Sequence, residues 1–189
     1  APTAGLVAGL VAPVPAFSSI SSVTAAGWLA LALSLSVFWA AAGAATHWYR
    51  RKSPNTWFIG AAAAWVAQEL LRAYLPPGFP WLFAGYTQWK LLPLIQISTL
   101  TGVYGVSFLV ALANATLAHA VLKPRSSCPW SPVGRFAPLA VSVLLVAGCY
   151  AGGFSARRSV TYTEGPTLGV VQQNIPRYVE ARSEERRVG

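Results

Sequence analysis

Long apolar runs alternate with short polar segments over most of this chain, and the runs are about twenty residues or more in length. A helix rises about 1.5 Å per residue, so a run of this length can cross the ~30 Å hydrocarbon core of a bilayer. The pattern predicts four membrane-spanning helices, at residues 22–48, 55–75, 97–121 and 136–154. Residues 4–16 are also apolar, but Pro13 and Pro15 interrupt them. The pattern leaves open whether they form the end of a helix or a lipid-facing loop.

The pattern changes after the fourth run. Residues 155–166 are polar and predict a linker. The next apolar run is short and lies between Gly-Pro and Asn-Ile-Pro, which favours a buried strand at Leu168–Val171. We therefore expect an all-α polytopic membrane helix bundle at residues 1–154. It is followed at residues 167–189 by the truncated start of an α/β domain.

Composition strengthens the membrane interpretation. Hydrophobic residues make up 54% of the chain and charged residues 10%, against about 25% charged residues in ordinary globular domains. The first charged side chain along the chain is Arg50. The net charge of +9 does not indicate binding to nucleic acid, because the basic residues lie in short clusters beside apolar runs, where topology signals belong.

The basic clusters lie in alternate loops. Arg50–Lys52 follow the first predicted span, and further basic residues lie between the third and the fourth. The loop at residues 76–96 carries only Lys90. By the positive-inside rule, the loops at 50–54 and 122–135 are expected to be cytoplasmic. The 76–96 loop and everything after the fourth span are then expected on the opposite side.

Two ionisable residues lie within the second predicted span. Glu69 and Arg72 are three residues apart, so they share one face of a helix. Ionisable groups in a membrane span are costly and often functional. One interpretation is a structural ion pair, with Arg72 extending outwards to the interface. The other is that the two side chains brace the loop that follows, or a polar cavity below it.

That loop has an unusual composition. The stretch PPGFPWLFAGYTQW, residues 76–89, contains three prolines, two glycines and five aromatic residues. Aromatic side chains suit the membrane interface, and proline stiffens the backbone. The loop is interpreted either as part of an aromatic belt or as a wall of a lipid-binding cavity.

Other polar residues in the apolar runs suggest packing rather than chemistry. Asn114, inside the third span, is expected to make an interhelical hydrogen bond. Gly148 and Gly152 are four residues apart in the fourth span and could permit close helix contact.

Candidate nucleophiles and metal ligands are scarce. Ser107 has no neighbouring base in the sequence, and Cys128 and Cys149 are interpreted as two unrelated thiols. No spacing of cysteine and histidine suggests a metal site, and no cofactor is expected.

Five motifs occur in a characteristic order. They are Glu69-Leu-Leu-Arg72, Gly78-Phe-Pro-Trp81, Gly85-Tyr-Thr-Gln88, Gly102-Val-Tyr-Gly-Val-Ser-Phe108 and Val171-Gln-Gln-Asn-Ile-Pro176. In this order and spacing the chain resembles apolipoprotein N-acyltransferase over roughly residues 22–178, although no single motif would be sufficient. The family has a membrane helix bundle, a periplasmic nitrilase-like α/β domain and a final membrane helix, so Leu168–Val171 resembles the first strand of the nitrilase-like domain.

The resemblance implies a multi-pass enzyme of the bacterial cytoplasmic (inner) membrane. Its partners would be a membrane phospholipid as acyl donor and diacylated lipoproteins as acyl acceptors. The acyl chain would pass to the N-terminal cysteine amine of the lipoprotein through a thioester on an enzyme cysteine. In the family a Glu acts as base, a Lys stabilises the oxyanion and a Cys is the nucleophile.

The resemblance carries over only some site residues to this chain. The catalytic Glu, Lys and Cys are expected beyond Gly189, so no catalytic residue is assigned. Lipid or substrate binding is expected at Phe79, Pro80, Trp81, Tyr86 and Gln88. A structural role is expected for Glu69, Arg72 and Asn114 in the membrane, and for Gln172 and Asn174 at the start of the nitrilase-like domain.

The chain also departs from the family. Glu180-Ala181 stands near the place where the family usually has a Lys-Trp pair, and the last residues, ARSEERRVG, match nothing in it. The resemblance also implies that the family's first helices are missing from the front of the chain. The sequence contains no methionine and ends in a charged run. We therefore expect a fragment of a longer protein, which is inactive by itself.

Two other functions remain open. A transporter would require polar groups in several spans or paired discontinuous helices, whereas only Glu69 and Arg72 qualify here. A non-catalytic membrane scaffold would not need the strand-first domain that is predicted to begin near Thr167.

Overall fold

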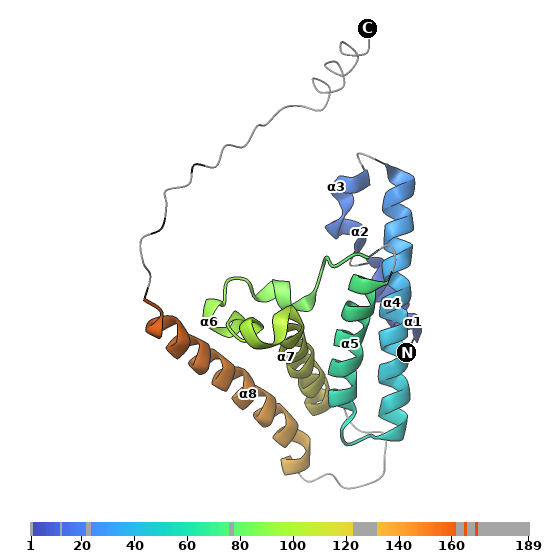
Figure 1. Ribbon diagram of the computed structural model, residues 1–189. Coiled ribbons are helices and arrows are strands. Elements are labelled where there is room, and N and C mark those ends of the chain that lie inside the picture. The colour runs from blue at the N-terminus through green and yellow to red at the C-terminus, as the bar shows by residue number, and fades with distance from the viewer. Residues whose placement is uncertain are drawn as a thin grey trace. The chain divides into compact units, whose positions relative to one another are not determined.

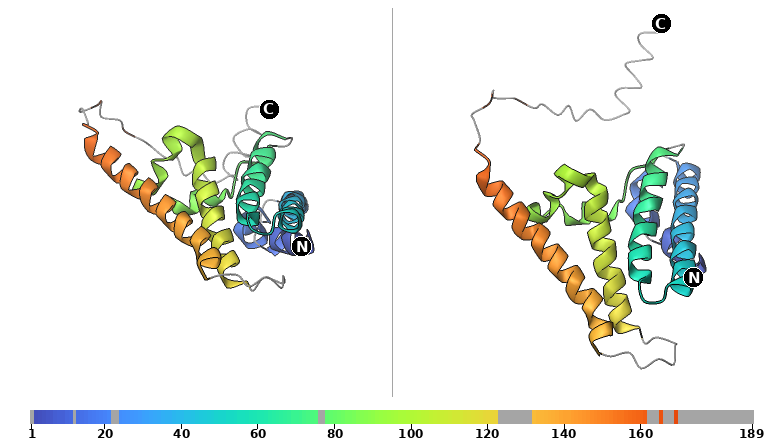
Figure 2. Two further views of the ribbon diagram at one scale, coloured as in Figure 1. Left: turned by 90° about the horizontal axis from the view of Figure 1, so that it is seen from below. Right: turned by 60° about the horizontal axis from the view of Figure 1, so that its bottom comes forward.

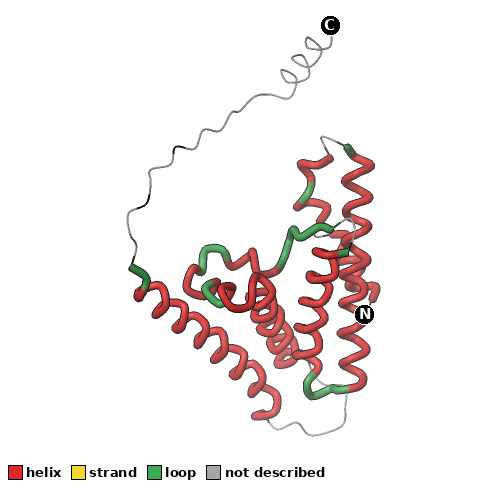
Figure 3. The backbone as a smooth tube through the Cα atoms, in the orientation of Figure 1, coloured by secondary structure: helices red, strands yellow, loops and turns green. Residues whose placement is uncertain are grey.

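The computed structural model describes residues 2–11, 13–21, 24–75, 78–122, 132–161, 165 and 169. Within these residues all regular structure is helical (Figure 1 and Figure 3). The elements are α1 (Pro2–Val11), α2 (Pro13–Ala16), α3 (Ser18–Ser21), α4 (Ala25–Lys52), α5 (Trp57–Tyr74), the 3₁₀ helix η1 (Ala84–Gln88), α6 (Leu92–Ile95), α7 (Ser98–Val121) and α8 (Pro132–Ser159).

The chain divides into a compact unit at residues 1–159 and a second unit at 160–189. The predicted strand at Leu168–Val171 belongs to the second unit and, apart from Gly169, lies outside the described residues, as do Gln172, Asn174 and the final segment. The start of a nitrilase-like domain therefore stays a prediction.

Each of the four predicted spans is a helix, which confirms the helical part of the prediction. Three helical segments of the described chain are long and apolar enough to cross a membrane, at residues 25–52, 98–121 and 135–159. Helix α5 has 18 residues, which is long enough, but it is not among them, because Gln68, Glu69 and Arg72 lower its mean hydropathy. The crossing of the membrane by α5 stays a prediction.

Local sequence explains the limits of α4. The Thr24 hydroxyl accepts a hydrogen bond from the Gly27 N–H (3.2 Å) and caps the first turn. The last turn contains Arg50, Arg51 and Lys52, whose positive charge is favourable beside the negative end of the helix dipole. A short turn then leads into α5, which lies beside α4 (Figure 2).

The first apolar segment, which the sequence left undecided, contains a helix packed on α4. A Cβ atom at Gly5 would lie 2.6 Å from the Trp39 carbonyl oxygen, and one at Gly9 would lie 2.7 Å from the Ser36 Cα. The two glycines are four residues apart, so they present one smooth face that allows α1 and α4 to approach closely.

A buried cluster joins α5 to α7. It consists of Trp57, Phe58, Ala62, Leu112 and Ala115. Beside it the indole N–H of Trp57 donates to Nδ1 of His119 (3.0 Å), so two polar groups in an apolar interior satisfy each other.

The contact between α7 and α8 corrects one prediction. The buried hydroxyls of Thr116 and Ser142 form a hydrogen bond between the two helices (2.8 Å). Asn114 is exposed, and its side-chain amide donates to the Val110 carbonyl of its own helix (2.8 Å). The expectation that Asn114 bonds to another helix was wrong, because its place on the helix turns it away from α8.

The glycines of α8 give a second correction. No described atom lies within 4 Å of a Cβ built at Gly148 or Gly152, so this pair makes no close helix contact. The close approach occurs at Gly153, where an added Cβ would collide with the Pro93 carbonyl of α6. Helix α8 therefore packs closely on α6 through Gly153, which lies on a different face of the helix from Gly148.

Candidate functional site

The candidate site is the aromatic loop, defined here as residues 78–91 between α5 and α6. It begins where α5 ends, and the Phe79 N–H donates to the Arg72 carbonyl (2.9 Å). Gly78 has a φ of +64°, a conformation that glycine adopts without strain. Leu82 has a φ of +57°, which is uncommon for a residue with a side chain. The backbone of the loop therefore follows one specific path, which is strained at Leu82.

Glu69 of α5 holds one point of the aromatic loop. Its Oε1 accepts a hydrogen bond from the Ala84 N–H (2.7 Å) and another from the Trp65 indole N–H (2.9 Å). The Glu69 side chain is completely buried. Because a charged acceptor strengthens such bonds, this carboxylate is a firm support for the start of η1.

Arg72 supports the same loop from one turn further along α5. Its Nη2 donates to the Leu82 carbonyl (3.3 Å), and its Cζ lies 5.2 Å from the centroid of the Phe83 ring. Arg72 is 2% exposed, so the interpretation in which it extends outwards was wrong. The side-chain hydrogen bonds and the ring contact described above for Glu69 and Arg72 go to the loop and to Trp65, which favours the bracing interpretation.

Helix α7 holds the next residue of the loop. The Ser107 hydroxyl accepts a hydrogen bond from the Gly85 N–H (2.9 Å), and both residues are buried. A Cβ at Gly85 would lie 2.8 Å from the Val103 carbonyl oxygen and 3.1 Å from the Ser107 Oγ. Glycine is therefore needed here for close approach, and Ser107 has a supporting role.

Several polar atoms near this support lack a hydrogen-bond partner among the described residues. They are both side-chain heteroatoms of Gln68, Oε2 of Glu69, and Nε and Nη1 of Arg72, all of them buried. Buried polar groups of this kind are costly in an apolar interior. Because such groups in a membrane span are often functional, their concentration at one end of α5 makes this end a candidate functional site.

The outer surface of the aromatic loop exposes large rings. Trp81 is 58% exposed, Tyr86 51% and Trp89 66%. Phe79 and Trp81 pack together (ring centroids 5.4 Å apart), and both contact Phe17. The inner side of the loop is thus fixed by hydrogen bonds to α5 and α7, and its outer side exposes apolar rings.

The remaining predicted binding residues surround these rings. Pro80 is exposed, and its carbonyl lies 3.5 Å from the Tyr86 hydroxyl that donates to it. Gln88 is half-buried and donates to the Thr87 hydroxyl (2.8 Å). The structure therefore brings Phe79, Pro80, Trp81 and Tyr86 into one patch, with Gln88 at the end of η1.

Sequence reasoning missed the partners inside the protein. It considered Ser107 as a nucleophile and as part of one motif, and Gly85 as part of another motif. It assigned no role to His119 or to the Thr116–Ser142 pair. The sequence contains one signal for the hydrogen bond between Ser107 and Gly85. Ser107 follows a glycine-rich segment at the start of an apolar helix.

Metal and thiol chemistry find no support in the described residues. No cluster of three metal-ligating side chains occurs there. Cys149 is a free, half-buried cysteine, and Cys128 lies outside the described residues.

The chain is similar to a family of known membrane enzymes. Residues 1–116 match the family model described as the apolipoprotein N-acyltransferase N-terminal domain. An apolipoprotein N-acyltransferase of Nitrosomonas europaea is 31% identical over 173 residues, which cover 90% of this chain and 31% of that protein.

Two further relatives carry the same name. The protein of Geobacter metallireducens is 62% identical over 53 residues, or 28% of this chain and 10% of the relative. The protein of Azotobacter vinelandii is 41% identical over 93 residues, or 48% of this chain and 18% of the relative. The chain spans less than a third of the length of each of these three proteins. No solved structure matches it significantly.

Proposed function

The chain belongs to the apolipoprotein N-acyltransferase N-terminal domain family, and we propose that it supplies membrane helices to an enzyme with that activity. The full enzyme transfers an acyl chain from a phospholipid to the N-terminal cysteine amine of a diacylated lipoprotein. A thioester on an enzyme cysteine is the intermediate. The observation that carries this proposal is the family match over residues 1–116, which include the whole aromatic loop and both of its supports.

Within that enzyme, the role of this chain is to position lipid. The aromatic loop forms part of the wall against which an acyl chain lies, through Phe79, Pro80, Trp81, Tyr86 and Gln88. The exposed rings of this loop support the role, because amphipathic rings settle at the level of lipid headgroups. Glu69, Arg72 and Ser107 keep the loop in place without touching substrate.

The proposed setting is the bacterial inner membrane. The aromatic loop faces the periplasm, and the loops at 50–54 and 122–135 face the cytoplasm, in agreement with the distribution of basic residues. Residues 167–189 then begin a periplasmic nitrilase-like domain after a linker.

The test is an acyl-transfer assay on the protein encoded by the reading frame continued past codon 189. A fluorescent phospholipid is the donor and a diacylated lipopeptide the acceptor. We expect transfer by the continued protein and none by residues 1–189 alone. Absence of transfer by the continued, folded protein would contradict the proposal, and so would full activity of residues 1–189.

A variant of the aromatic loop tests the lipid-positioning role. Trp81→Ala in the continued protein is expected to slow transfer several-fold, because it removes an exposed ring from the proposed acyl-chain wall. Trp48→Ala is the matched control, since Trp48 is 60% exposed but lies at the far end of α4. Equal rates for the two variants would argue against the role of the loop.

A further inference from the structure

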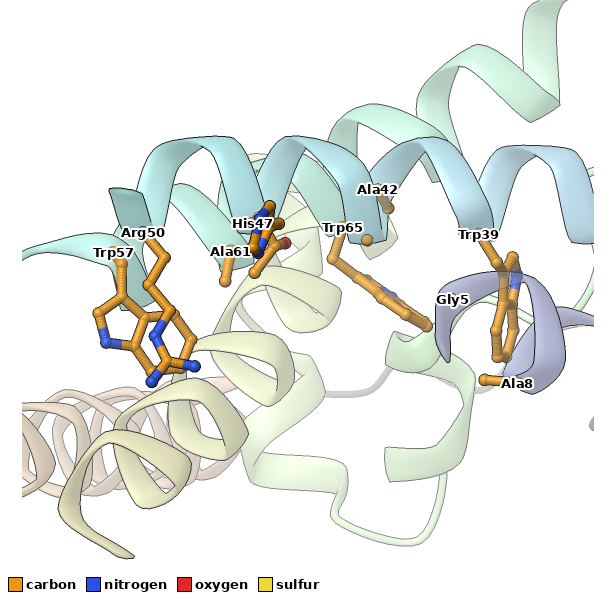
Figure 4. A pocket seen from close by; sticks show the side chains of 11 residues that line it. Gly5, Ala8, Trp39, Ala42, His47, Arg50, Trp57, Ala61 and Trp65 are labelled. Atoms are coloured by element: carbon orange, nitrogen blue, oxygen red, sulfur yellow. The ribbon is translucent and has the colours of Figure 1, made fainter. Parts of the chain in front are cut away.

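An apolar hollow, separate from the aromatic loop, lies along α4 and α5. Its volume is about 560 Å³, within the range of small-molecule sites. It runs from Gly5, Ala8 and Trp39 at one end to Arg50 and Trp57 at the other (Figure 4). We call it the α4–α5 groove. The remaining lining residues are Ala42, Gly43, Thr46, His47, Ala61 and Trp65.

The groove is apolar along most of its length and positive at one end. The Arg50 guanidinium carbon lies 5.3 Å from the centroid of the Trp57 ring, so the side chain bends towards the groove (Figure 4). His47 lines the groove one turn earlier, and Arg51 and Lys52 follow Arg50 in the same helix. An elongated apolar ligand with a negative head would match this distribution.

The protein itself offers this positive end no acidic partner in its described part. Glu69 is the only acidic residue before Glu164. Its carboxylate binds the Ala84 N–H and the Trp65 indole, one turn from Arg72 near the other end of α5. Positive charge at Arg50 is therefore available to a ligand from the membrane.

We propose that the α4–α5 groove binds one acyl chain of an anionic phospholipid whose headgroup phosphate contacts Arg50. Basic pockets between membrane helices are suited to anionic headgroups, and an arginine can bind phosphate oxygens through two parallel N–H donors. Thr46 and Ala61 line the middle of the groove, where the chain lies against small side chains. The site is distinct from the aromatic loop and does not depend on acyl transfer.

Native mass spectrometry of the delipidated, detergent-purified chain tests the site. The probes are phosphatidylglycerol, which is anionic, and phosphatidylcholine, which is zwitterionic. We expect one tightly retained phosphatidylglycerol. Arg50→Ala should weaken its binding about fivefold, as expected for the loss of one basic side chain near a headgroup. Arg51→Ala is the matched control, because Arg51 belongs to the same basic triplet but does not line the groove.

A second pair of variants tests the apolar part. Thr46→Trp should fill the groove and reduce retention, whereas Ala45→Trp, at an exposed neighbouring position, should not. Far-UV circular dichroism checks that each variant keeps its helices. Equal effects of Arg50→Ala and Arg51→Ala, equal retention of the two lipids, or a second copy of the chain bound in place of lipid would each overturn the proposal.

Discussion

At the scale of single residues, the structure explains why two motifs far apart in the sequence belong together. The first two residues of η1, Ala84 and Gly85, have N–H groups that a helix cannot satisfy internally. Glu69 from α5 accepts from the first, and Ser107 from α7 accepts from the second. Glu69 and Ser107 therefore each have a defined partner in η1, and the aromatic loop is fixed from α5 on one side and from α7 on the other.

Gly85→Ala is expected to destabilise the protein by about 1–3 kcal/mol, which is typical of overpacking. The added methyl group would lie 2.8 Å from the Val103 carbonyl oxygen, with the helix backbone unable to move away. Unfolding by denaturing detergent measures the effect. Gly148→Ala, where nothing lies within 4 Å, should be neutral or slightly stabilising. Similar losses in both variants would show that the close approach at Gly85 does not matter.

Ser107→Ala is expected to cost about 1–3 kcal/mol, because it leaves the buried N–H of Gly85 without its acceptor. The control is Ser155→Ala, because the exposed Ser155 hydroxyl donates to the Ala151 carbonyl of its own helix. That change should stay within about 0.5 kcal/mol. The same unfolding measurement applies, and a neutral Ser107→Ala would remove Ser107 from the support of the loop.

At the scale of elements, several helix contacts depend on small residues or on polar bonds between the helices. Gly5 and Gly9 permit the α1–α4 contact, and Gly153 permits the α6–α8 contact. Between α7 and α8 the Thr116 and Ser142 hydroxyls share a hydrogen bond, and the Arg135 guanidinium of α8 donates to the Ala120 and Val121 carbonyls of α7. Packing of apolar surfaces gives little driving force in lipid, so these local features decide which faces meet.

A double-mutant cycle of Thr116→Val and Ser142→Ala measures the α7–α8 bond. We expect a coupling energy of about 0.6 kcal/mol, the usual size for such a bond in a membrane protein. Asn114→Ala serves as the control, because Asn114 is exposed and its side chain, among the described residues, bonds only within α7. A cycle of Asn114→Ala with Ser142→Ala should show no coupling. Coupling in that cycle would restore the interhelical role that the sequence suggested.

At the scale of the whole molecule, the arrangement places different chemistry at opposite ends of α5. The start of α5 lies beside the basic end of α4, and its last turns hold the aromatic loop. With 18 residues, α5 spans about 27 Å. Glu69 and Arg72 lie in the last two turns and are both covered by the loop. A membrane position for α5 is thus consistent with its charged residues.

The topology that follows is testable with single cysteines. In a background with Cys128 and Cys149 replaced by serine, Lys90→Cys should react with a membrane-impermeant thiol reagent added to intact spheroplasts. Asn55→Cys, in the turn after the basic cluster, should react only after the membrane is opened. The reverse pattern would contradict the positive-inside assignment, and labelling of both sites would contradict the crossing of α5.

The sequence by itself determined the four long helices, α4, α5, α7 and α8, and their order. Long apolar runs ended by basic clusters or proline permit one outcome in a membrane, because the backbone must satisfy its own hydrogen bonds there. It also predicted that Glu69 and Arg72 share a face, since residues three apart must do so on a helix. The loop motifs were visible, but their partners were not.

Only the tertiary structure decided which side chains meet. The contacts of Ala84 with Glu69 and of Gly85 with Ser107 cross 15 and 22 residues. No helical periodicity encodes a distance between separate elements. The same limit explains why Gly153 rather than Gly148 or Gly152 makes the contact of α8, and why Thr116 rather than Asn114 bonds to its neighbour. A helix offers several faces of similar composition, and the rotation of each helix is fixed only when its neighbours are in place.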